Sequence, residues 1–348
     1  MKKPVALESS SKILVVGPSW VGDMIMAQSL FITLKNSEPD CHIDVLAPAW
    51  SLALLARMPQ VAKAIAMPLT HGQFGLIDRI RLGKQLRPEN YDKAIVLPNS
   101  WKSALIPFFA HIPVRSGYVG ECRRSLLNDA RKLDKALLTM TVQRFVALGL
   151  PPNAPLPPEI PTPAIVIGQD RQQAVADKFK LKPAAKILAL CPGAEYGPAK
   201  RWPAQYFAEI ARKKIAQGWQ IWLFGSGNDN DIAMQINNET NGLCTDFTGR
   251  TSLAEAVDLM SLVDTVVSND SGLMHVAAAL DKKIIAVYGS SDPRFTPPLN
   301  AKARVISLNL ACAPCFKRAC PLYPAGHKDN TRCLTGIKPA GVLDLIDA

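Results

Sequence analysis

The sequence has no run of about 18 or more uncharged apolar residues, so we expect no transmembrane helix. Two lysines near the N-terminus precede neither an apolar stretch nor a small-residue cleavage site, so we predict no secretory signal and a cytoplasmic protein. Aromatic residues make up only 7% of the 348 residues, but 48% of the chain is apolar, which is enough for sizeable cores. Because the length exceeds that of most single domains, we expect about two domains.

Two common nucleotide-binding motifs are also missing. The loop GPSWVGDM (17–24) contains G-x4-G, but it lacks the Lys-Ser/Thr ending of a P-loop, and it is not G-x-G-x-x-G. The sequence therefore argues against nicotinamide binding and against ATP hydrolysis. No zinc-finger, RNP or helix-turn-helix pattern is evident, so we expect no nucleic-acid partner.

Negative charge is scarce in the first half of the chain. The formal net charge is +11, and residues 1–150 hold 19 Lys and Arg against 11 Asp and Glu, a formal +8. Such an excess indicates an acidic partner: an acidic substrate, an anionic membrane face or nucleic acid. The alternative is that these basic residues only cover solvated helix faces, as in the helix-like segments 78–93 and 121–135.

Eight cysteines occur in a chain for which we predict no export, so reduced thiols are expected. Four of them cluster near the C-terminus: Cys312, Cys315, Cys320 and Cys333. The first pair has the C-x2-C spacing of a zinc knuckle and His327 lies within the cluster, but the other two cysteines form no second C-x2-C. A proline-rich surface loop with inert thiols is the favoured interpretation, and a structural metal site is the alternative.

Strand-like and helix-like segments alternate on both sides of Leu150–Ala164, which holds seven prolines and is typical of a linker. The strand-like segments are 12–17, 42–48, 62–68 and 91–98 before the linker, and 186–193, 220–227, 264–268 and 282–291 after it. This alternation predicts an α/β fold with two doubly wound, Rossmann-like domains, residues 1–160 and 161–348, facing a central cleft.

The segment SNDSGLMHVAAAL (268–280) resembles the exit of a buried strand into a helix. Backbone N–H groups at a helix start favour an anion such as phosphate. Three residues would supply them here: Ser271, Gly272 and Leu273. Asp270 would repel a phosphate and suits sugar hydroxyls instead. His275 lies on the helix face of Ser271, where it is either a ligand contact or, more often, a packing residue.

Two further loops follow predicted strands in the second half. In CPGAEYGPAKRWP (191–203), Lys200 and Arg201 precede a helix start and suit a diphosphate, although solvated side chains are the alternative. In LFGSGNDND (223–231), Gly225 and Ser226 would let the backbone approach a ligand, although an ordinary tight turn explains the same residues.

The glycine-lined loop at 17–24 brings one carboxylate, Asp23, to the start of a helix. Asp commonly caps helices, so this residue is either only a cap or a general base that takes a proton from an attacking hydroxyl.

Taken together, the VGDM loop, PGAEYGPAKRWP and SNDSGLMHVAAAL resemble the ADP-heptose:lipopolysaccharide heptosyltransferases of Gram-negative bacteria, which are GT-B glycosyltransferases. The order and spacing of these segments agree over nearly the whole chain. The PGAEYGPAKRWP form and the cysteine-rich tail are most similar to the members that add the second heptose of the inner core.

The resemblance implies an acceptor-binding first domain, a donor-binding second domain and inverting transfer of L-glycero-D-manno-heptose from ADP-heptose. The acceptor would be the first heptose of heptosyl-Kdo2-lipid A. Asp23 matches the general base and Lys200 the lysine at the donor phosphate. The D-[ST]-G-x-x-H donor motif matches at Asp270, Ser271, Gly272 and His275. We expect no cofactor and no obligatory metal, since no D-x-D pair ends a predicted strand.

The chain departs from the family at two places. Members that add the first heptose carry a glutamate after W-G-A that binds adenosine, whereas FGSGN stands here, so nucleoside contacts at 227–229 are not assigned. Their paired threonines near the phosphate are replaced by Ala194, Glu195 and Tyr196.

The lipid-linked acceptor implies peripheral contact with the cytosolic face of the inner membrane. Two alternative functions remain: a nucleotide-sugar 2-epimerase of similar two-domain fold, and a non-catalytic basic protein that binds polyanions.

Overall fold

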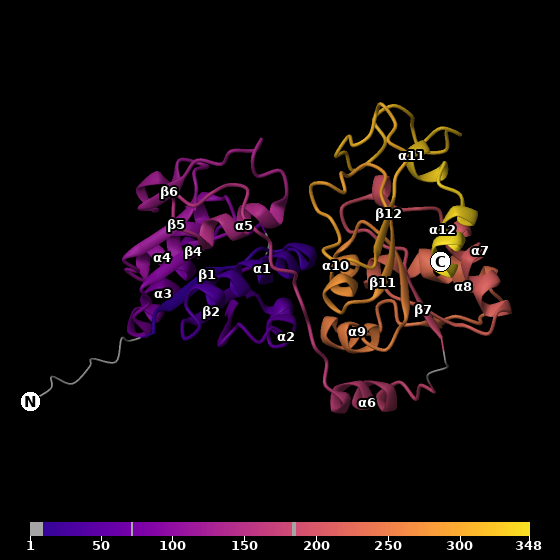
Figure 1. The fold of residues 1–348 in the computed structure, drawn as a ribbon, viewed down its shortest axis with the longest axis horizontal. Coiled ribbons are helices and arrows are strands. Elements are labelled where there is room, and N and C mark those ends of the chain that lie inside the picture. The colour runs from indigo at the N-terminus through magenta and orange to yellow at the C-terminus, as the bar shows by residue number, and fades with distance from the viewer. Residues whose placement is uncertain (1–9, 71, 183–185) are drawn as a thin grey trace, which may run out of the picture. The chain divides into compact units, whose positions relative to one another are not determined.

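The computed structural model describes residues 10–70, 72–182 and 186–348 (Figure 1). The chain divides into two compact units. Unit 1 comprises Met1–Ser19 and Met26–Pro161, and unit 2 comprises Trp20–Ile25 and Thr162–Ala348. The short segment Trp20–Ile25, which carries Asp23, therefore belongs with the second unit although it precedes most of the first in sequence.

Unit 1 is built on a six-stranded parallel sheet with the order β3-β2-β1-β4-β5-β6 (Figure 1). Its strands are β1 (Lys12–Val16), β2 (His42–Pro48), β3 (Lys63–Met67), β4 (Lys93–Val96), β5 (Val114–Tyr118) and β6 (Asp129–Arg131). The helices along this part of the chain are α1 (Val21–Ser37), α2 (Leu52–Leu55), α3 (Leu76–Leu86), α4 (Leu105–Phe109) and α5 (Thr141–Gly149), with short 3-10 turns between them.

The central strands of unit 1 are buried on both faces. Leu14 and Val16 of β1 pack with Leu86 of α3 and with Leu105 and Ile106 of α4. Since side chains alternate along a strand, the residues between them face the opposite layer of helices. Burial of both faces explains the continuous apolar runs of these strands.

Unit 2 repeats this architecture in the order β12-β11-β10-β7-β8-β9, again all parallel. Its strands are β7 (Ile187–Cys191), β8 (Gln220–Leu223), β9 (Thr245–Asp246), β10 (Thr265–Asn269), β11 (Lys283–Val287) and β12 (Ala303–Ile306). The helices are α6 (Gln169–Lys178), α7 (Ala204–Ala216), α8 (Asn230–Glu239), α9 (Leu253–Met260), α10 (Gly272–Ala279), α11 (Arg332–Thr335) and α12 (Pro339–Asp347).

An aromatic group anchors one face of the unit 2 sheet. The Trp202 side chain is fully buried, stacks edge-on against Phe207 of α7 and donates a hydrogen bond from Nε1 to the carbonyl of Ile337. It thereby joins α7 to the chain that enters α12. Burying an aromatic side chain of this size is among the larger single contributions to a core, at about 3–5 kcal/mol on truncation to alanine.

In both sheets the strand order reverses beside the first strand of the unit. In unit 1 the chain runs outward from β1 through β2 and β3 and then restarts at β4 on the other side of β1. In unit 2 it runs from β7 through β8 and β9 and restarts at β10. Loops that leave the carboxyl ends of two such strands diverge, which is where open α/β sheets bind ligands.

The α/β fold class is confirmed, but two local expectations are corrected. The segment 121–135 is not a helix: it holds a 3-10 turn at Arg123–Ser125 and the strand β6. The guanidinium of Arg123 is fully buried and donates to the carbonyls of Tyr118 and Pro98, so tertiary contacts override the helical spacing. The apolar spacing of the segment 50–58 also predicts a helix, but the structure has only the short helix α2 there, after a 3-10 turn.

Among residues 10–70, 72–182 and 186–348, no helix is long and apolar enough to cross a membrane, as the sequence predicts.

Candidate active site

Lys200 and Asp270 form an ion pair at the carboxyl edge of the unit 2 sheet. Asp270 follows β10 directly and its side chain is 6% exposed. Lys200 ends the 3-10 turn Pro198–Lys200 in the loop after β7. Two strands adjacent at the reversal of strand order therefore bring together a lysine and an aspartate that are 70 positions apart.

Asn269, the last residue of β10, holds the two loops in place. Its side chain is fully buried, donates to the carbonyl of Pro192 at 2.6 Å and accepts from the backbone N–H of Trp202 at 3.0 Å. One amide thus fixes both ends of the loop that carries Lys200. The pattern SNDSG contains this asparagine but predicts no role for it. Its only signal in the sequence is a polar residue at the end of an otherwise apolar strand.

The start of α10 has the geometry that the sequence predicts for an anion site. Ser271 is the N-cap in extended conformation, and its hydroxyl does not cap the helix but lies 3.2 Å from the hydroxyl of Ser268. The first turn begins with Gly272 and Leu273, whose N–H groups have no partner within the helix because they precede its first hydrogen-bonded turn. With the positive end of the helix dipole, these groups can stabilise a phosphate.

Asp23 lies in the first turn of α1, which begins at Val21. It is therefore not the N-cap, and no carboxylate hydrogen bond or ion pair of Asp23 occurs among the residues that the structure describes. Burial raises the pKa of Asp23 to about 6, while the charge of Lys200 lowers it and that of Asp270 raises it. A carboxylate with a pKa close to neutral is suited to general-base catalysis.

The segment with Asp23 is fixed by close contact between two glycine-containing helix starts. A Cβ atom on Gly22 would lie 2.6 Å from Cδ2 of His275, and one on Gly272 would lie 2.8 Å from Cβ of Val21. The imidazole of His275 therefore packs directly on the α1 backbone beside Asp23. Burial lowers the pKa of His275 to about 4, so the ring is neutral at pH 7.

The loop with Gly225 and Ser226 has a different internal structure. The backbone N–H and hydroxyl of Ser226 both donate to Asp229 Oδ2 at 2.9 Å. A Cβ on Gly225 would approach Asp229 to 2.9 Å, and Arg201 lies 3.5 Å from the other carboxylate oxygen. The structure thus brings this loop to the same sheet edge as Lys200, but the N–H and hydroxyl of Ser226 are already hydrogen-bonded to Asp229.

Three buried hydroxyls have no hydrogen-bond partner among the described residues: Thr248, Ser290 and Ser291. All three follow strands of the unit 2 sheet at its carboxyl ends, the first after β9 and the two serines after β11. Buried polar groups are normally paired, so orphans gathered at one edge point to a ligand there. Sequence patterns do not predict these hydroxyls as ligand contacts, since a serine or threonine after a strand is too common to indicate binding.

The four clustered cysteines line one cavity of about 270 Å³ together with Ala199 and Ser290. All four thiols are free. Within residues 10–70, 72–182 and 186–348, no three His, Cys, Asp or Glu side chains gather closely enough to hold a metal ion. Both interpretations of this cluster, inert thiols in a loop and a structural metal site, stay predictions.

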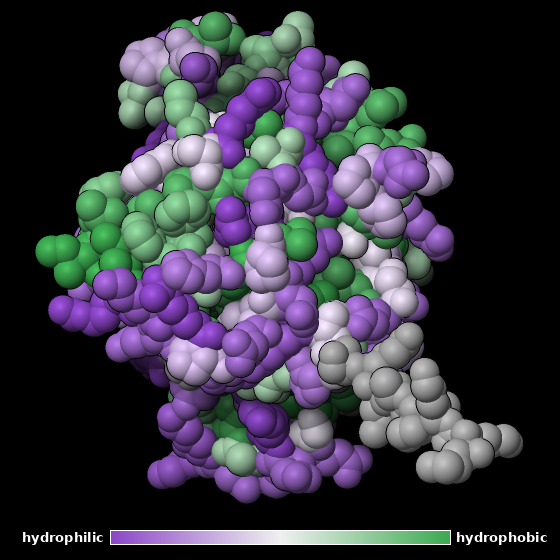
Figure 2. All heavy atoms as spheres, turned by 90° about the vertical axis from the view of Figure 1, so that its left-hand side faces the viewer, coloured by the Kyte–Doolittle hydropathy of each residue, from purple (hydrophilic) through white to green (hydrophobic). Residues whose placement is uncertain are grey.

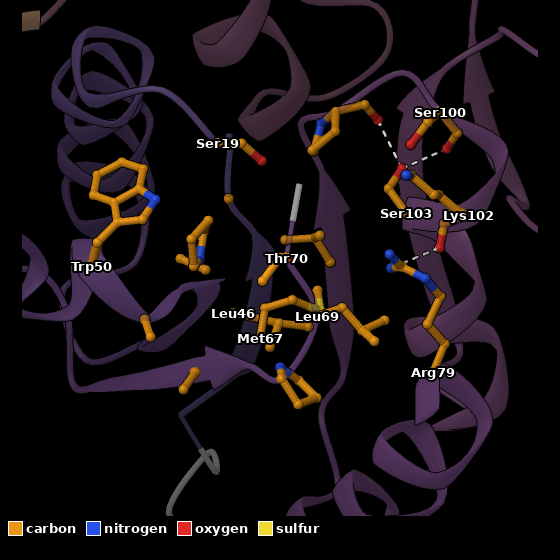
Figure 3. A pocket seen from close by; sticks show the side chains of 18 of the residues that line it. Ser19, Leu46, Trp50, Met67, Leu69, Thr70, Arg79, Ser100, Lys102 and Ser103 are labelled. Carbon is orange, nitrogen blue, oxygen red and sulfur yellow. Dashed lines mark hydrogen bonds between the residues drawn. The ribbon is translucent and has the colours of Figure 1, made fainter. Parts of the chain in front are cut away.

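Unit 1 carries a larger cavity at the corresponding edge of its own sheet, of about 730 Å³. It is lined by the loops that follow β1, β2, β3 and β4. Figure 3 shows Trp50 on one side and Ser100, Lys102 and Arg79 on the other, with Leu46, Met67 and Leu69 between them. The indole of Trp50 is 40% exposed.

Arg79 organises the rim of this cavity. Its guanidinium is 5% exposed and donates to the carbonyls of Phe74 at 2.7 Å, Lys102 at 3.3 Å and Gln73 at 3.4 Å. Phe74 in turn stacks on Trp101 with ring centroids 6.1 Å apart. The lining of the cavity itself combines the exposed ring of Trp50 and Lys102 with apolar residues, which suits sugar rings that carry acidic groups.

A comparison with protein families matches residues 79–325 to glycosyltransferase family 9 (heptosyltransferase). The chain is 50% identical over 306 residues to lipopolysaccharide heptosyltransferase 2 of Salmonella typhimurium, covering 85% of this chain and 88% of the relative. It is 49% identical over 307 residues to lipooligosaccharide heptosyltransferase 2 of Haemophilus influenzae, with the same coverage.

Among solved structures, the chain is similar to ADP-heptose lps heptosyltransferase II of E. coli, with a TM-score of 0.84, 42% identity and 97% of each chain covered. A family 9 glycosyltransferase from Veillonella parvula, 19% identical with a TM-score of 0.82, shares the fold. The predicted resemblance and the GT-B type of fold are thus confirmed. The chain belongs to glycosyltransferase family 9, the heptosyltransferases, and is a glycosyltransferase.

Proposed function

We propose that this enzyme transfers L-glycero-D-manno-heptose from ADP-heptose to the first heptose of the lipopolysaccharide inner core, with inversion at the sugar carbon. The observation that carries the proposal is one arrangement in unit 2: the Lys200–Asp270 ion pair, the start of α10 and the carboxylate of Asp23 with its raised pKa. Relatives named heptosyltransferase 2 at about half identity support the choice of donor and acceptor.

The donor half of the mechanism follows from charge. Breaking the bond between sugar and diphosphate leaves negative charge on ADP. Lys200 and the backbone N–H groups of Gly272 and Leu273 are fixed before the reaction, so they stabilise that charge without reorganisation. Asp270, held by Lys200, would accept hydrogen bonds from sugar hydroxyls, and the hydroxyl of Ser271 would add a further contact.

The acceptor half requires a base. The acceptor hydroxyl gives its proton to Asp23 as its oxygen forms a bond to the anomeric carbon, and the bond from that carbon to the diphosphate breaks. Asp23 stands ionised above a pH of about 6, as this role requires. The neutral ring of His275 would hold the turn that carries Asp23. A direct contact between His275 and the donor stays a prediction.

We assign the cavity of unit 1 to the acceptor. Its exposed Trp50 ring would stack on a sugar, and Lys102 lies at the rim for an acidic group of the core. The basic first half of the chain would attract the anionic acceptor and the membrane that anchors it. Figure 2 shows a face on which hydrophilic side chains predominate and hydrophobic ones form smaller areas, which suits peripheral electrostatic contact.

We further propose that the reaction needs neither a cofactor nor an obligatory metal ion, because Lys200 and the α10 start supply the positive charge that a metal would otherwise provide. Asp229 and Asp231 have D-x-D spacing, but the carboxylate of Asp229 is engaged by Ser226 and Arg201. We also propose that the backbone of Gly225 and Ser226 contacts the donor.

The test is a transfer assay with ADP-heptose and heptosyl-Kdo2-lipid A, with and without EDTA, in which ADP release and acceptor mass are both recorded. Kdo2-lipid A without heptose is the matched control acceptor. We expect a mass gain of one heptose per ADP released, unaffected by EDTA and absent with the control.

Four other outcomes of this assay would contradict the proposal or part of it. ADP release without a mass gain would indicate hydrolysis or another acceptor. A new sugar isomer without ADP release would indicate an epimerase. Loss of transfer in EDTA that Mg²⁺ restores would overturn the metal-free proposal. A folded protein that only binds polyanions, steeply weakened by salt, would favour the non-catalytic alternative.

A further inference from the structure

The cysteine-rich segment between β12 and α11 is hydrogen-bonded to the loop that carries Lys200. The backbone N–H of Ala199 donates to the carbonyl of Arg318 at 3.0 Å, and the hydroxyl of Tyr196 donates to the carbonyl of Phe316 at 2.8 Å. The N–H of Phe316 in turn donates to the carbonyl of Ser290 at 2.7 Å. The loops after β7 and β11, which leave the same edge of the unit 2 sheet, are therefore both hydrogen-bonded to residues 316–318.

Gly197 allows this close approach. Its φ of 149° lies in a region that side chains disfavour, and a Cβ there would lie 2.6 Å from the carbonyl oxygen of Arg318. The loop with Lys200 therefore lies directly against the backbone of Arg318. Such contact fixes the position of the Arg318 backbone relative to the donor site.

Two cations lie close to the ring of Tyr196. Nζ of Lys200 lies 5.2 Å from its centroid, and Cζ of Arg318 lies 5.4 Å from it. Both distances are within the range of a cation–π interaction. Lys200 also has a carboxylate partner in Asp270. The side chain of Arg318 has no ion pair and no hydrogen bond within the part of the chain that the structure describes, and it is exposed.

The charges around Lys200 favour a second cation for the diphosphate. Lys200 stands against two carboxylates, Asp270 and Asp23, and the neighbouring Arg201 is paired with Asp229. A nucleoside diphosphate adds several negative charges to this edge. The ring of Tyr196 holds Arg318 beside Lys200. A guanidinium can donate two parallel N–H hydrogen bonds to phosphate oxygens.

We propose that Arg318 binds the diphosphate of the donor as a second cation beside Lys200, and that the cysteine-rich segment serves to present it. The inference rests on the proposed function and names a further residue of that same site. Tyr196 takes part by positioning both cations on one ring. This gives the segment a role in donor binding that does not depend on a metal.

The test compares binding of ADP and of adenosine by calorimetry to wild type, Arg318→Gln and Lys317→Gln. Lys317 is the adjacent exposed cation and serves as the matched control. We expect Arg318→Gln to weaken ADP binding by about ten- to a hundredfold, the size of a lost charge-assisted hydrogen bond. Adenosine affinity and the melting temperature should be unchanged, and Lys317→Gln should behave as wild type.

Two results would overturn the inference alone: equal ADP affinity in Arg318→Gln and wild type, or an equal loss for ADP and adenosine, which would indicate a structural effect. An equal loss in Lys317→Gln would also overturn it, because general surface charge would then explain the effect. Failure of folded wild type to bind ADP would instead overturn the proposed function, and the inference with it.

Discussion

The two sheets of this protein have the same six parallel strands and the same reversal of strand order, yet their carboxyl edges differ in chemistry. The edge of unit 1 surrounds a cavity of about 730 Å³. The guanidinium of Arg79, which lines it, donates its hydrogen bonds to backbone carbonyls. The edge of unit 2 carries an ion pair, together with the three buried hydroxyls and the side chain of Arg318, which have no hydrogen-bond or carboxylate partner among the described residues.

The shared fold determines where ligands bind, and the loops determine which ligand binds. A large cavity with an exposed tryptophan suits a saccharide, whereas fixed charges and a helix start suit a diphosphate. Substitutions at the two edges should therefore separate: those in unit 1 should change acceptor kinetics, and those in unit 2 should change donor binding or the chemical step.

The largest effect is expected at Asp23. Asp23→Asn should lower kcat by about 10²–10⁴-fold, the usual contribution of a general base, while ADP affinity stays within a few fold of wild type. Steady-state transfer and calorimetry with ADP measure the two quantities. Asp40→Asn, which changes an exposed aspartate of unit 1, is the control. Retention of kcat in Asp23→Asn would assign the base to another group.

Lys200→Ala should cost about 10²–10³-fold in kcat/KM for ADP-heptose, because a fixed positive charge at the leaving group is lost. ADP should also bind more weakly, whereas the KM for the acceptor should hold. Lys213→Ala is the matched control, since Lys213 is an exposed lysine of α7 that pairs with Glu209. A change confined to the acceptor KM would contradict the assignment of this edge to the donor.

The Gly22–His275 contact should be sensitive to a single methyl group. Gly22→Ala introduces a Cβ 2.6 Å from the imidazole, which should cost about 1–3 kcal/mol of stability and slow transfer by displacing Asp23. Adding His275→Ala removes the clash, so the double variant should recover part of the lost stability in thermal denaturation. Gly341→Ala, where a Cβ meets nothing within 4 Å, should be neutral or stabilising.

The raised pKa of Asp23 predicts opposite pH trends for activity and stability. Log kcat/KM should fall by about one unit per pH unit below pH 6, where Asp23 becomes protonated. Between pH 3.8 and about 6 the folded state holds a proton that the unfolded state has lost, so the stability due to this group falls as pH rises through that window.

Asp23→Asn should therefore gain stability over wild type at pH 8 relative to pH 4.5, by about 2 kcal/mol, because most of the titration window lies between these two pH values. Denaturant unfolding of both proteins at the two pH values measures the difference, in which all unchanged groups cancel. Since the pKa of His275 is about 4, its titration would not produce a break near pH 6. A flat difference between the two pH values would contradict the raised pKa.

The smallest effect is expected in unit 1. Trp50→Ala should raise the KM for the acceptor by several fold, in line with about 0.5–1.5 kcal/mol for an aromatic contact, and leave ADP binding unchanged. Trp50→Phe should retain most of the affinity. Initial rates at varied acceptor concentration, with ADP-heptose saturating, measure the change. Loss of ADP affinity in Trp50→Ala would contradict the assignment of acceptor binding to the edge of unit 1 and donor binding to that of unit 2.

Continuous apolar runs predicted the buried strands, whereas strands without such a run were missed. Strands such as β1 and β10 are buried on both faces and form continuous apolar runs. The strands β6, β9 and β12 lie at sheet edges and are short or partly exposed, and the sequence of β5 is VRSGY, so none of the four was predicted. The edge strand β3 was predicted, since the run 62–68 is mostly apolar. The segment 121–135 was misjudged because burial of Arg123, which no local spacing reveals, decides its conformation.

The sequence by itself determined the alternation of strands and helices, the break at the proline-rich linker, and which strand-end loops carry charged residues, because these depend on local spacing and composition. Only the tertiary structure decided that Lys200 pairs with Asp270, that His275 packs on Gly22, and that Arg318 shares the ring of Tyr196 with Lys200. Such contacts join residues far apart in the chain, and they arise from strand order and close packing.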